Sequence, residues 1–150
     1  MDKSKARKLA AELNGLLADY MVFYQNVRGL HWNIKGKKFF ELHAQFETLY
    51  NYLITKADEV AERVLTLQEV PLHTFEDYLS ASSIKSRKNL TGGEEAVRAV
   101  LEDLLALLQR QRELLLLANE TGDEGTAAIL SEYVKEQEKM AWMYEAFLND

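Results

Sequence analysis

The chain has no cysteine and only one proline among its 150 residues. Without cysteine, disulfide bonds, iron–sulfur clusters and thiolate metal sites are excluded, so any metal must be bound by imidazole and carboxylate groups. The scarcity of proline and glycine leaves long runs rich in Leu, Ala, Glu and Lys, a composition that favours an all-α protein. The length and the 47% hydrophobic content predict a single domain over residues 1–150 with a sizeable core.

A long apolar run and an excess of positive charge are also lacking. The apolar stretch near the N-terminus is interrupted by Glu12, Asn14 and Asp19, so neither a signal peptide nor a membrane span is expected, and the cytoplasm is the predicted location. The net charge of −6 opposes binding to nucleic acid, because that affinity rests on neutralising phosphates with cations. A short basic cluster over residues 3–8 is expected to run into the first helix.

Apolar residues recur at helical spacing in four long segments. The first two are expected from about residue 4 to about 32 and from about residue 39 to about 67, with Pro71 following the second. The pattern Thr91-Gly92-Gly93-Glu94 predicts a capping box in which Thr91 is the N-cap, followed by a helix that stops near Gly122. The last segment forms a helix that runs nearly to the C-terminus.

The connection between the second and third long helices is polar and unusually long. It covers residues 68–90 and has room for a short helix over residues 74–79 that crosses the bundle. Such a connection reaches the far end of the bundle, whereas a short one would force the two helices to be antiparallel neighbours. Four long helices with one long crossover predict a ferritin-like four-helix bundle.

The residues with metal-binding chemistry gather between His31 and Glu62, a stretch that holds two of the three histidines and an acidic pair, Asp58 and Glu62. A helix rises about 1.5 Å per residue, so His43 and Asp58 lie about 22 Å apart along the axis of one helix. They cannot bind the same ion within one chain. An antiparallel two-fold partner would bring the histidine end of one chain against the carboxylate end of the other, twice per dimer.

Helical angles support a shared site. At about 100° per residue, four polar side chains of the second helix fall within an arc of about 100°. These are His43, Glu47, Asp58 and Glu62. The apolar residues of that helix are centred about 120° away, so the ligand stripe flanks the core of its own chain. Ile54 and Leu65 share the stripe, which makes it resemble a surface buried by a partner.

Two interpretations of this stripe stay open at the level of the residues. Two imidazoles and two carboxylates suit Fe(II) and leave positions for water or an oxidant, and zinc could bind there too. The usual intrachain di-iron centre is not predicted, because no histidine is preceded by glutamate in a Glu-x-x-His pair. In the second interpretation these residues have only a structural role: the histidines cap or pack at helix ends, and the acids form a solvated helix face. The residues alone favour neither interpretation over the other.

Two motifs at the right separation resemble the paired signature of the Dps family, the ferritin-like mini-ferritins named for DNA-binding proteins from starved cells. The likeness extends over almost the whole chain, as far as Thr126 and the pair Trp142-Met143. The motifs are His31-Trp32-Asn33-Ile34-x-Gly36-x-x-Phe39-Phe40-x-Leu42-His43 and Asp58-Glu59-x-Ala61-Glu62-Arg63.

The resemblance implies a function as well as a fold. It implies a hollow homo-dodecamer, built from two-fold dimers, that oxidises Fe(II), preferably with hydrogen peroxide, stores ferric mineral inside and protects against oxidative stress. It also implies ferroxidase centres at the two-fold interfaces, with the histidines of one subunit and the acids of the other. The residues so implied are His31, His43, Asp58 and Glu62.

Three further expectations follow from comparing residues with the family pattern. Glu47 stands where many members have Asp, and it is a candidate ligand of a second iron. Asp123 and Glu124 match acidic pore positions. DNA binding usually relies on a mobile Lys-rich tail, so few residues before the first helix and −6 charges on each copy disfavour it. Two rival hypotheses remain, a nucleoid-associated DNA-binding protein and a helical interaction module whose histidines only pack.

Overall fold

The computed structural model describes residues 2–149, which contain five α-helices. The short helix α3 (Phe75–Ala81) lies in the connection between α2 and α4. The four long helices are α1 (Lys3–Asn33), α2 (Phe39–Thr66), α4 (Gly93–Glu120) and α5 (Glu124–Leu148). The predicted all-α, ferritin-like bundle with a short crossover helix is thus confirmed, and the basic cluster lies in the first turns of α1, as expected.

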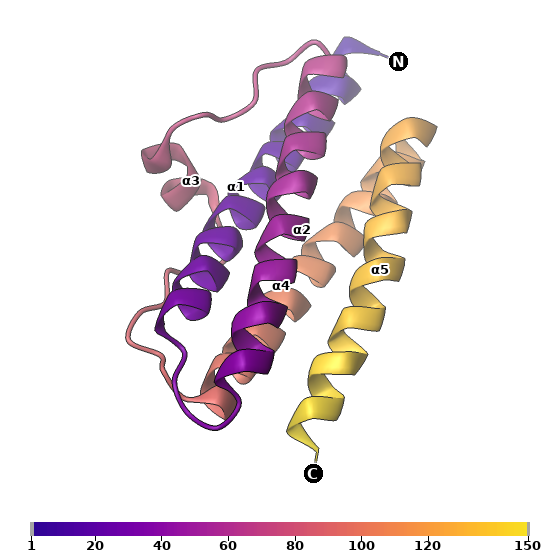
Figure 1. Cartoon of the computed structure of the whole chain (residues 1–150). Helices are drawn as coiled ribbons and strands as arrows, with labels where there is room; N and C mark the ends of the chain where they lie inside the picture. The colour runs from indigo at the N-terminus through magenta and orange to yellow at the C-terminus, as the bar shows by residue number, and fades with distance from the viewer. Residues whose placement is uncertain (1, 150) are drawn as a thin grey trace.

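The helices form two antiparallel pairs (Figure 1). α2 returns beside α1, and α5 returns beside α4. The connection over residues 67–92 runs back along α1, so α4 begins at the end of the bundle where α2 begins (Figure 1). At that end the backbone N–H of Lys35 donates to the carbonyl of Thr91 over 2.9 Å. α2 and α4 are therefore parallel, an arrangement that a short loop does not allow.

Polar side chains on α1 hold the crossover in place. They are Asn14, Asp19 and Asn26. The Asn14 side-chain oxygen accepts a hydrogen bond from the Leu72 N–H over 2.9 Å. Asp19 accepts one from the Ser83 N–H over 2.7 Å, and Asn26 accepts one from the Arg87 N–H over 2.9 Å. The crossover has few neighbours of its own, so these bonds supply partners that secondary structure would otherwise provide. We call these three residues the crossover clips.

The start of α4 differs by one residue from the capping box predicted by the sequence. The N-cap is Gly92 instead of Thr91, and the reciprocal acid is Glu95 instead of Glu94. The Glu95 carboxylate accepts from the N–H groups of Gly92 and Thr91, both at 3.0 Å, and these bonds lower its pKa. Because Gly92 has no side chain to cap the first turn, only the half of the capping box that the acid supplies is formed.

The apolar face of α2 is buried as the helical spacing predicts. Phe39, at the first turn, is only partly buried. The residues that enter the core are Leu42, Phe46, Leu49, Leu53, Val60 and Val64. Together with the leucines of α1 and α4, this face forms part of the buried core that stabilises the bundle.

A hydrogen-bonded polar network crosses the centre of the bundle. Tyr20 of α1 donates to Gln111 of α4 over 2.5 Å, and the Gln111 amide donates to Gln137 of α5 over 2.7 Å. The Gln137 amide in turn donates to the hydroxyls of Tyr20 and Tyr52, at 2.7 and 3.3 Å. Tyr20, Gln111 and Gln137 are fully buried. Amides and phenols, none of them charged, therefore fill the middle of the four-helix bundle.

This central network ends in a charged group between α2 and α5. Tyr52 and Tyr133 donate to the carboxylates of Glu136 and Glu59, over 2.7 and 2.6 Å. The Lys56 ammonium lies 3.4 Å from Glu59 and 3.9 Å from Glu136, and 5.1 Å from the centre of each tyrosine ring. The Lys56 cation, which the two aromatic faces attract, and the two tyrosine hydroxyls thus balance the two acids within the chain.

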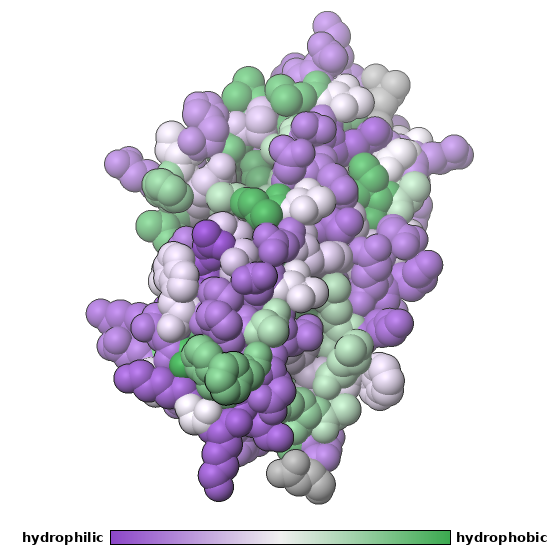
Figure 2. Space-filling view, in the orientation of Figure 1, coloured by the Kyte–Doolittle hydropathy of each residue, from purple (hydrophilic) through white to green (hydrophobic). Residues whose placement is uncertain are grey.

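The surface mixes charged residues with smaller apolar areas. In the orientation of Figure 1, one pale green area follows the lower half of α5 toward the C-terminus (Figure 2). Met143 and Phe147 of that helix are exposed. Within residues 2–149, no helix combines the length and apolar character that a membrane crossing requires.

Candidate metal centre

His31 and His43 meet at the junction of α1 and α2. α1 ends at Asn33, and a tight turn in which Gly36 has a φ of +112° leads into α2. Glycine adopts this left-handed backbone without a steric penalty. The turn reverses the chain so that the two imidazole rings stack, with centroids 3.8 Å apart and planes inclined by 13°. Two histidines separated by 12 residues thus form one pair.

Each histidine is oriented by the backbone of the other. The Nδ1 atom of His31 lies 2.7 Å from the carbonyl oxygen of His43, and Nδ1 of His43 lies 2.8 Å from the carbonyl oxygen of His31. A carbonyl oxygen only accepts, so each Nδ1 carries the proton and each neutral ring keeps its lone pair on Nε2. This is the tautomer that a metal-binding imidazole requires, fixed by the hydrogen bond on the opposite nitrogen.

Aromatic groups complete the support of the histidine pair. Phe39 stacks on the outer face of His43, with centroids 4.9 Å apart, and Tyr50 meets His31 edge-on at 5.2 Å. The Arg28 guanidinium lies 4.3 Å from the centre of the Tyr50 ring and 5.4 Å from that of Trp32. His31 is buried and His43 is partly exposed, so the pair is rigid yet open on one side.

Glu47 is the one predicted acid that lies near the histidines in the same chain. One of its carboxylate oxygens is 3.8 Å from Nε2 of His31, and its side chain is 56% exposed. This distance is too long for a hydrogen bond and leaves room for an ion that contacts both atoms. Glu47 therefore belongs to the histidine end of α2.

Asp58 and Glu62 lie near the other end of α2, exposed on its surface. Among residues 2–149, no three His, Asp or Glu side chains come close enough together to hold one metal ion. The separation of about 22 Å expected from the helix rise thus describes the folded chain as well. Within one chain the predicted ligands form two halves, one of imidazole and one of carboxylate.

Comparison with known proteins decides the family. A family model of the ferritin-like domain matches residues 10–150. The chain is 40% identical over 135 residues to the DNA protection during starvation protein of Porphyromonas gingivalis, covering 90% of this chain and 85% of the relative. The crystal structure of a Dps protein from Vibrio cholerae matches it with a TM-score of 0.98 and 50% identity, covering 99% of this chain and 94% of that one. This chain belongs to the Dps family of ferritin-like proteins.

A second crystal structure, that of a Dps protein from Bacillus brevis, matches with a TM-score of 0.95 and 35% identity, covering 99% of this chain and all of that one. The Vibrio cholerae protein is described as a member of the ferritin-like diiron-carboxylate superfamily. The Dps-family chain described here therefore belongs to the same superfamily. Its own bundle centre, however, holds the tyrosine and glutamine network in place of paired carboxylates and histidines.

Two residues of the second Dps motif have a structural role. Glu59 accepts the Tyr133 hydroxyl of α5, and Arg63 donates to Asp123 over 2.8 Å and to Thr126 over 2.9 Å. Both therefore join α2 to α5. The neighbouring Asp58 and Glu62 point to the surface instead. The motif thus combines residues that fix the helix with residues that stay available at its surface.

The two acids matched to pore positions differ in the structure. Asp123 is 5% exposed and caps the start of α5 by accepting from the Thr126 N–H over 3.0 Å. Burial alone would raise the pKa of Asp123, but hydrogen bonds from Thr126 and the charge of Arg63 outweigh burial and lower it. Asp123 is therefore committed to holding α5. Glu124 is exposed, and its place in a pore stays a prediction.

Three residues that support the histidine pair were not predicted to do so. Phe39 belongs to the first Dps motif, whereas Tyr50 and Arg28 lie outside both motifs. Helical spacing could have suggested Arg28, since residues three apart lie on one face. The contact of Tyr50 with His31 depends on how α1 and α2 pack, which spacing within one helix does not determine.

Proposed function

We propose that this chain is the subunit of a cytoplasmic iron-oxidising and iron-storing cage. In this proposal it oxidises Fe(II), preferably with hydrogen peroxide, at sites shared by two-fold related copies, and a homo-dodecamer stores the ferric mineral and limits oxidative damage. One observation carries the proposal: two imidazoles with Nε2 lone pairs held ready at one end of α2, and two exposed carboxylates at the other end. Family membership supports it.

The two halves have complementary chemistry. His31 and His43 bind Fe(II) as neutral donors whose rings cannot turn, because each Nδ1 is tied to a backbone carbonyl. Asp58 and Glu62 of a facing copy supply negative charge, which favours the ferric product over the ferrous substrate. Imidazole and carboxylate together, with open coordination positions, are the ligand set expected for non-haem iron that reacts with an oxidant.

Glu47 gives the site room for a second iron. Its carboxylate lies beside Nε2 of His31, on the exposed side of the pair. Two Fe(II) ions each give one electron to hydrogen peroxide, whose O–O bond breaks, and two protons complete two molecules of water. Because both electrons arrive together, no hydroxyl radical is released. The neighbouring Arg28 adds a positive charge behind the histidines, held on aromatic rings instead of on a ligand.

DNA binding is not part of this proposal. The basic residues at the start of the chain lie in the first turns of α1. The net charge of −6 on each copy repels a duplex. The name of the Porphyromonas gingivalis relative refers to DNA protection, and removal of Fe(II) and peroxide would protect DNA without contact.

Subunit mixing tests whether the site is shared. We expect His31→Ala and Asp58→Ala each to abolish rapid peroxide-driven oxidation of Fe(II) while leaving the particle mass, measured by light scattering, unchanged. In a dimer of one His31→Ala and one Asp58→Ala subunit, one site carries both changes and the other carries neither. Random mixing should therefore restore about a quarter of the wild-type oxidation capacity, because half of the dimers are mixed and each has one intact site.

The mixing experiment has clear controls. Co-assembly of His31→Ala with His43→Ala subunits should restore nothing, because every site then has a damaged histidine pair. No recovery in the His31→Ala and Asp58→Ala mixture, despite proven co-assembly, would eliminate the shared site. A monomeric wild-type particle would eliminate the cage and favour a helical interaction module.

A further inference from the structure

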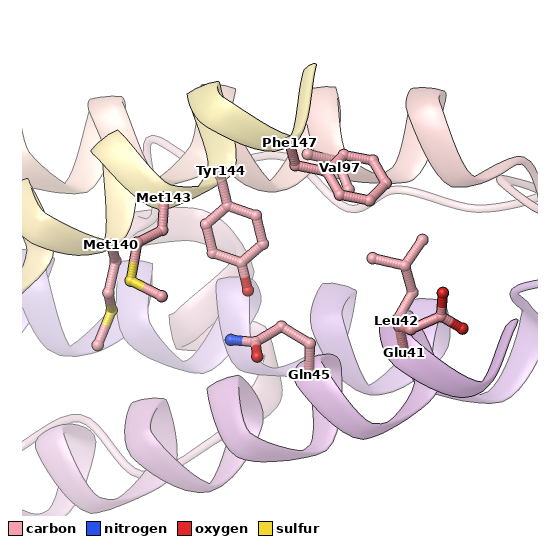
Figure 3. A pocket seen from close by; sticks show the side chains of 8 residues that line it. All are labelled: Glu41, Leu42, Gln45, Val97, Met140, Met143, Tyr144 and Phe147. Atoms are coloured by element: carbon pink, nitrogen blue, oxygen red, sulfur yellow. The ribbon is translucent and has the colours of Figure 1, made fainter. Parts of the chain in front are cut away.

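An apolar groove lies between α2 and α5, on the part of the surface where α5 approaches the C-terminus (Figures 2 and 3). Its volume is about 240 Å³. Leu42 of α2, Val97 of α4, and Met140, Met143 and Phe147 of α5 supply the apolar walls. An apolar cavity of about 150 Å³ is enough to bind benzene, so this groove has room for one ring with a small substituent.

One buried polar group in the groove has no partner. The Tyr144 side chain hangs from α5 toward α2, and its hydroxyl points at the Gln45 side chain (Figure 3). The residue is 6% exposed, and its hydroxyl makes no hydrogen bond. The Gln45 amide is the polar group beside this hydroxyl, and it offsets part of the rise in pKa that burial causes. A buried hydroxyl without a partner is unfavourable, and most buried polar groups find one.

The Tyr144 hydroxyl is a hydrogen-bond donor at every physiological pH. Burial raises its pKa to about 12, which the Gln45 amide offsets only in part. A donor at the inner end of an apolar groove selects a ligand with an acceptor at one end. Gln45 is exposed on α2, so its side chain has room to turn aside for such an acceptor.

The charge around the groove restricts the ligand further. Glu41 is the charged residue of the lining, and no Lys or Arg side chain is part of it. A carboxylate ligand would meet Glu41 without a cation to balance it, in apolar surroundings that strengthen the repulsion. The ligand is therefore expected to be neutral.

We propose that this groove is a binding site for a neutral, single-ring aromatic carbonyl compound, whose oxygen accepts a hydrogen bond from Tyr144. The ring packs against the methionine and phenylalanine side chains of α5, where sulfur and aromatic contacts are favourable. This site is separate from the histidine pair and does not depend on iron oxidation. It uses residues that the Dps motifs do not contain, apart from Leu42.

Three probes of nearly equal shape test the site on the assembled wild-type protein. They are acetophenone, α-methylstyrene, in which a CH₂ group replaces the carbonyl oxygen, and benzoate, the anionic counterpart. Titration calorimetry should show saturable binding of acetophenone about tenfold tighter than of α-methylstyrene, a ratio typical of one net hydrogen bond. Benzoate should not bind. Equal affinities for acetophenone and α-methylstyrene would overturn the proposal.

Matched variants locate the effect. Tyr144→Phe removes only the hydroxyl and should make the two neutral probes bind equally. The control is Tyr78→Phe, which removes a hydroxyl that donates to Leu72 in the crossover. This control should keep the tenfold preference for acetophenone. Gln45→Ala should tighten acetophenone binding by uncovering the hydroxyl. If Tyr144→Phe keeps the preference, the proposal is wrong.

A crystal soaked with 4′-bromoacetophenone gives the position directly. Anomalous density for bromine between α2 and α5 would support the site. Bromine density elsewhere would overturn the proposal. Density in the groove without any binding in solution would mean binding at crystal concentration only, and it would overturn the proposal as well. If a neighbouring copy fills the groove in the assembled particle, none of the probes will bind and the proposal fails, although the iron site would be unaffected.

Discussion

The centre of the bundle and its histidine end are both built from polar side chains, but they differ in how complete they are. In the central network, Tyr20, Gln111 and Gln137 give and receive hydrogen bonds among themselves, and Lys56 balances the acids at its edge. At the histidine end, each imidazole uses one nitrogen for the backbone and keeps the other free. A network completed within one chain stabilises that chain, whereas an incomplete one is available for an ion and a partner.

The comparison also explains how one fold can host a different site. In the di-iron bundles that the ferritin-like fold includes, ligands from all four helices point into the middle of the bundle. Here the same middle is filled by neutral amides and phenols, and within residues 2–149 no three His, Asp or Glu side chains come together there. The predicted ligands lie instead at the end of α1 and along the flank of α2, where a symmetric neighbour has access to them.

The largest effect on stability is expected at the centre. Gln137→Leu leaves the buried Gln111 amide without its acceptor, which costs about 1–3 kcal/mol, and removes one of the two hydrogen bonds of Tyr20, which contributes about 1 kcal/mol, so unfolding should become easier by about 2–4 kcal/mol. Denaturant titration measures the loss. The same change at the exposed residue Gln109 should stay within about 0.5 kcal/mol.

The central variant also separates the two regions by activity. The oxidation rate per folded particle should be unchanged in Gln137→Leu, because the histidine pair lies at the end of the bundle. If Gln137→Leu kept the stability of the wild type but lost iron oxidation, the central network would serve the activity and not the stability, contrary to the roles assigned here.

A smaller and pH-dependent effect is expected where α2 meets α5. Arg63→Leu leaves the buried Asp123 carboxylate without its cation and should lower the free energy of unfolding by about 1–3 kcal/mol at neutral pH. The folded-state pKa of Asp123 is lowered, so its contribution is present above the unfolded value of about 3.9 and is lost as the pH falls through the folded value. The difference between wild type and variant should therefore shrink in acid.

The control for this pair is Arg98→Leu. Arg98 pairs with Glu94 on the exposed surface of α4, where such pairs contribute only about 0.3–0.5 kcal/mol. Unfolding curves at several pH values compare the two variants. A loss in Arg63→Leu that is the same at pH 3 and pH 7 would mean that packing of the arginine side chain, and not the Asp123 charge, stabilises the contact.

The smallest effect is expected at Glu47. Glu47→Gln keeps the shape of the side chain and removes its charge, so we expect iron oxidation to slow by about tenfold, in the range usual for residues that support a metal site, with no change in stability. Stopped-flow absorbance of ferric product measures the rate. Glu113→Gln, an exposed change on α4, should have no effect. A complete loss in Glu47→Gln would instead make this residue as essential as Asp58.

Sequence patterns predicted the helices well because the apolar spacing is long and regular. The first four helices lie within one or two residues of the expected ranges, the last one runs nearly to the C-terminus as expected, and α2 buries the face that the spacing selects. The capping box was wrong by one residue, since Thr91-x-x-Glu94 and Gly92-x-x-Glu95 are adjacent patterns and only the backbone geometry chooses between them. Hydrophobic periodicity carries no information about such a choice.

The candidate site was predictable in composition but not in detail. The sequence shows that His43 and Asp58 are too far apart on one helix, and the folded chain keeps these two halves separate. It does not show that two histidines 12 residues apart bond to each other's backbone, because this depends on the turn at Gly36 and on the packing of α1 against α2. The central network was missed for a similar reason, as tyrosine and glutamine follow no period.

The crossover clips have a consequence for the route of the chain during folding. A bundle in which α4 ran in the opposite direction would bury nearly the same apolar area, with the connection over residues 67–92 displaced from α1. Asn14, Asp19 and Asn26 penalise that miswired form, because each would lose the backbone N–H group that it meets in the crossover. These three side chains on α1 thereby favour the observed direction of α4 over the reversed one. Burial of apolar surface alone would leave the two forms nearly equal in energy.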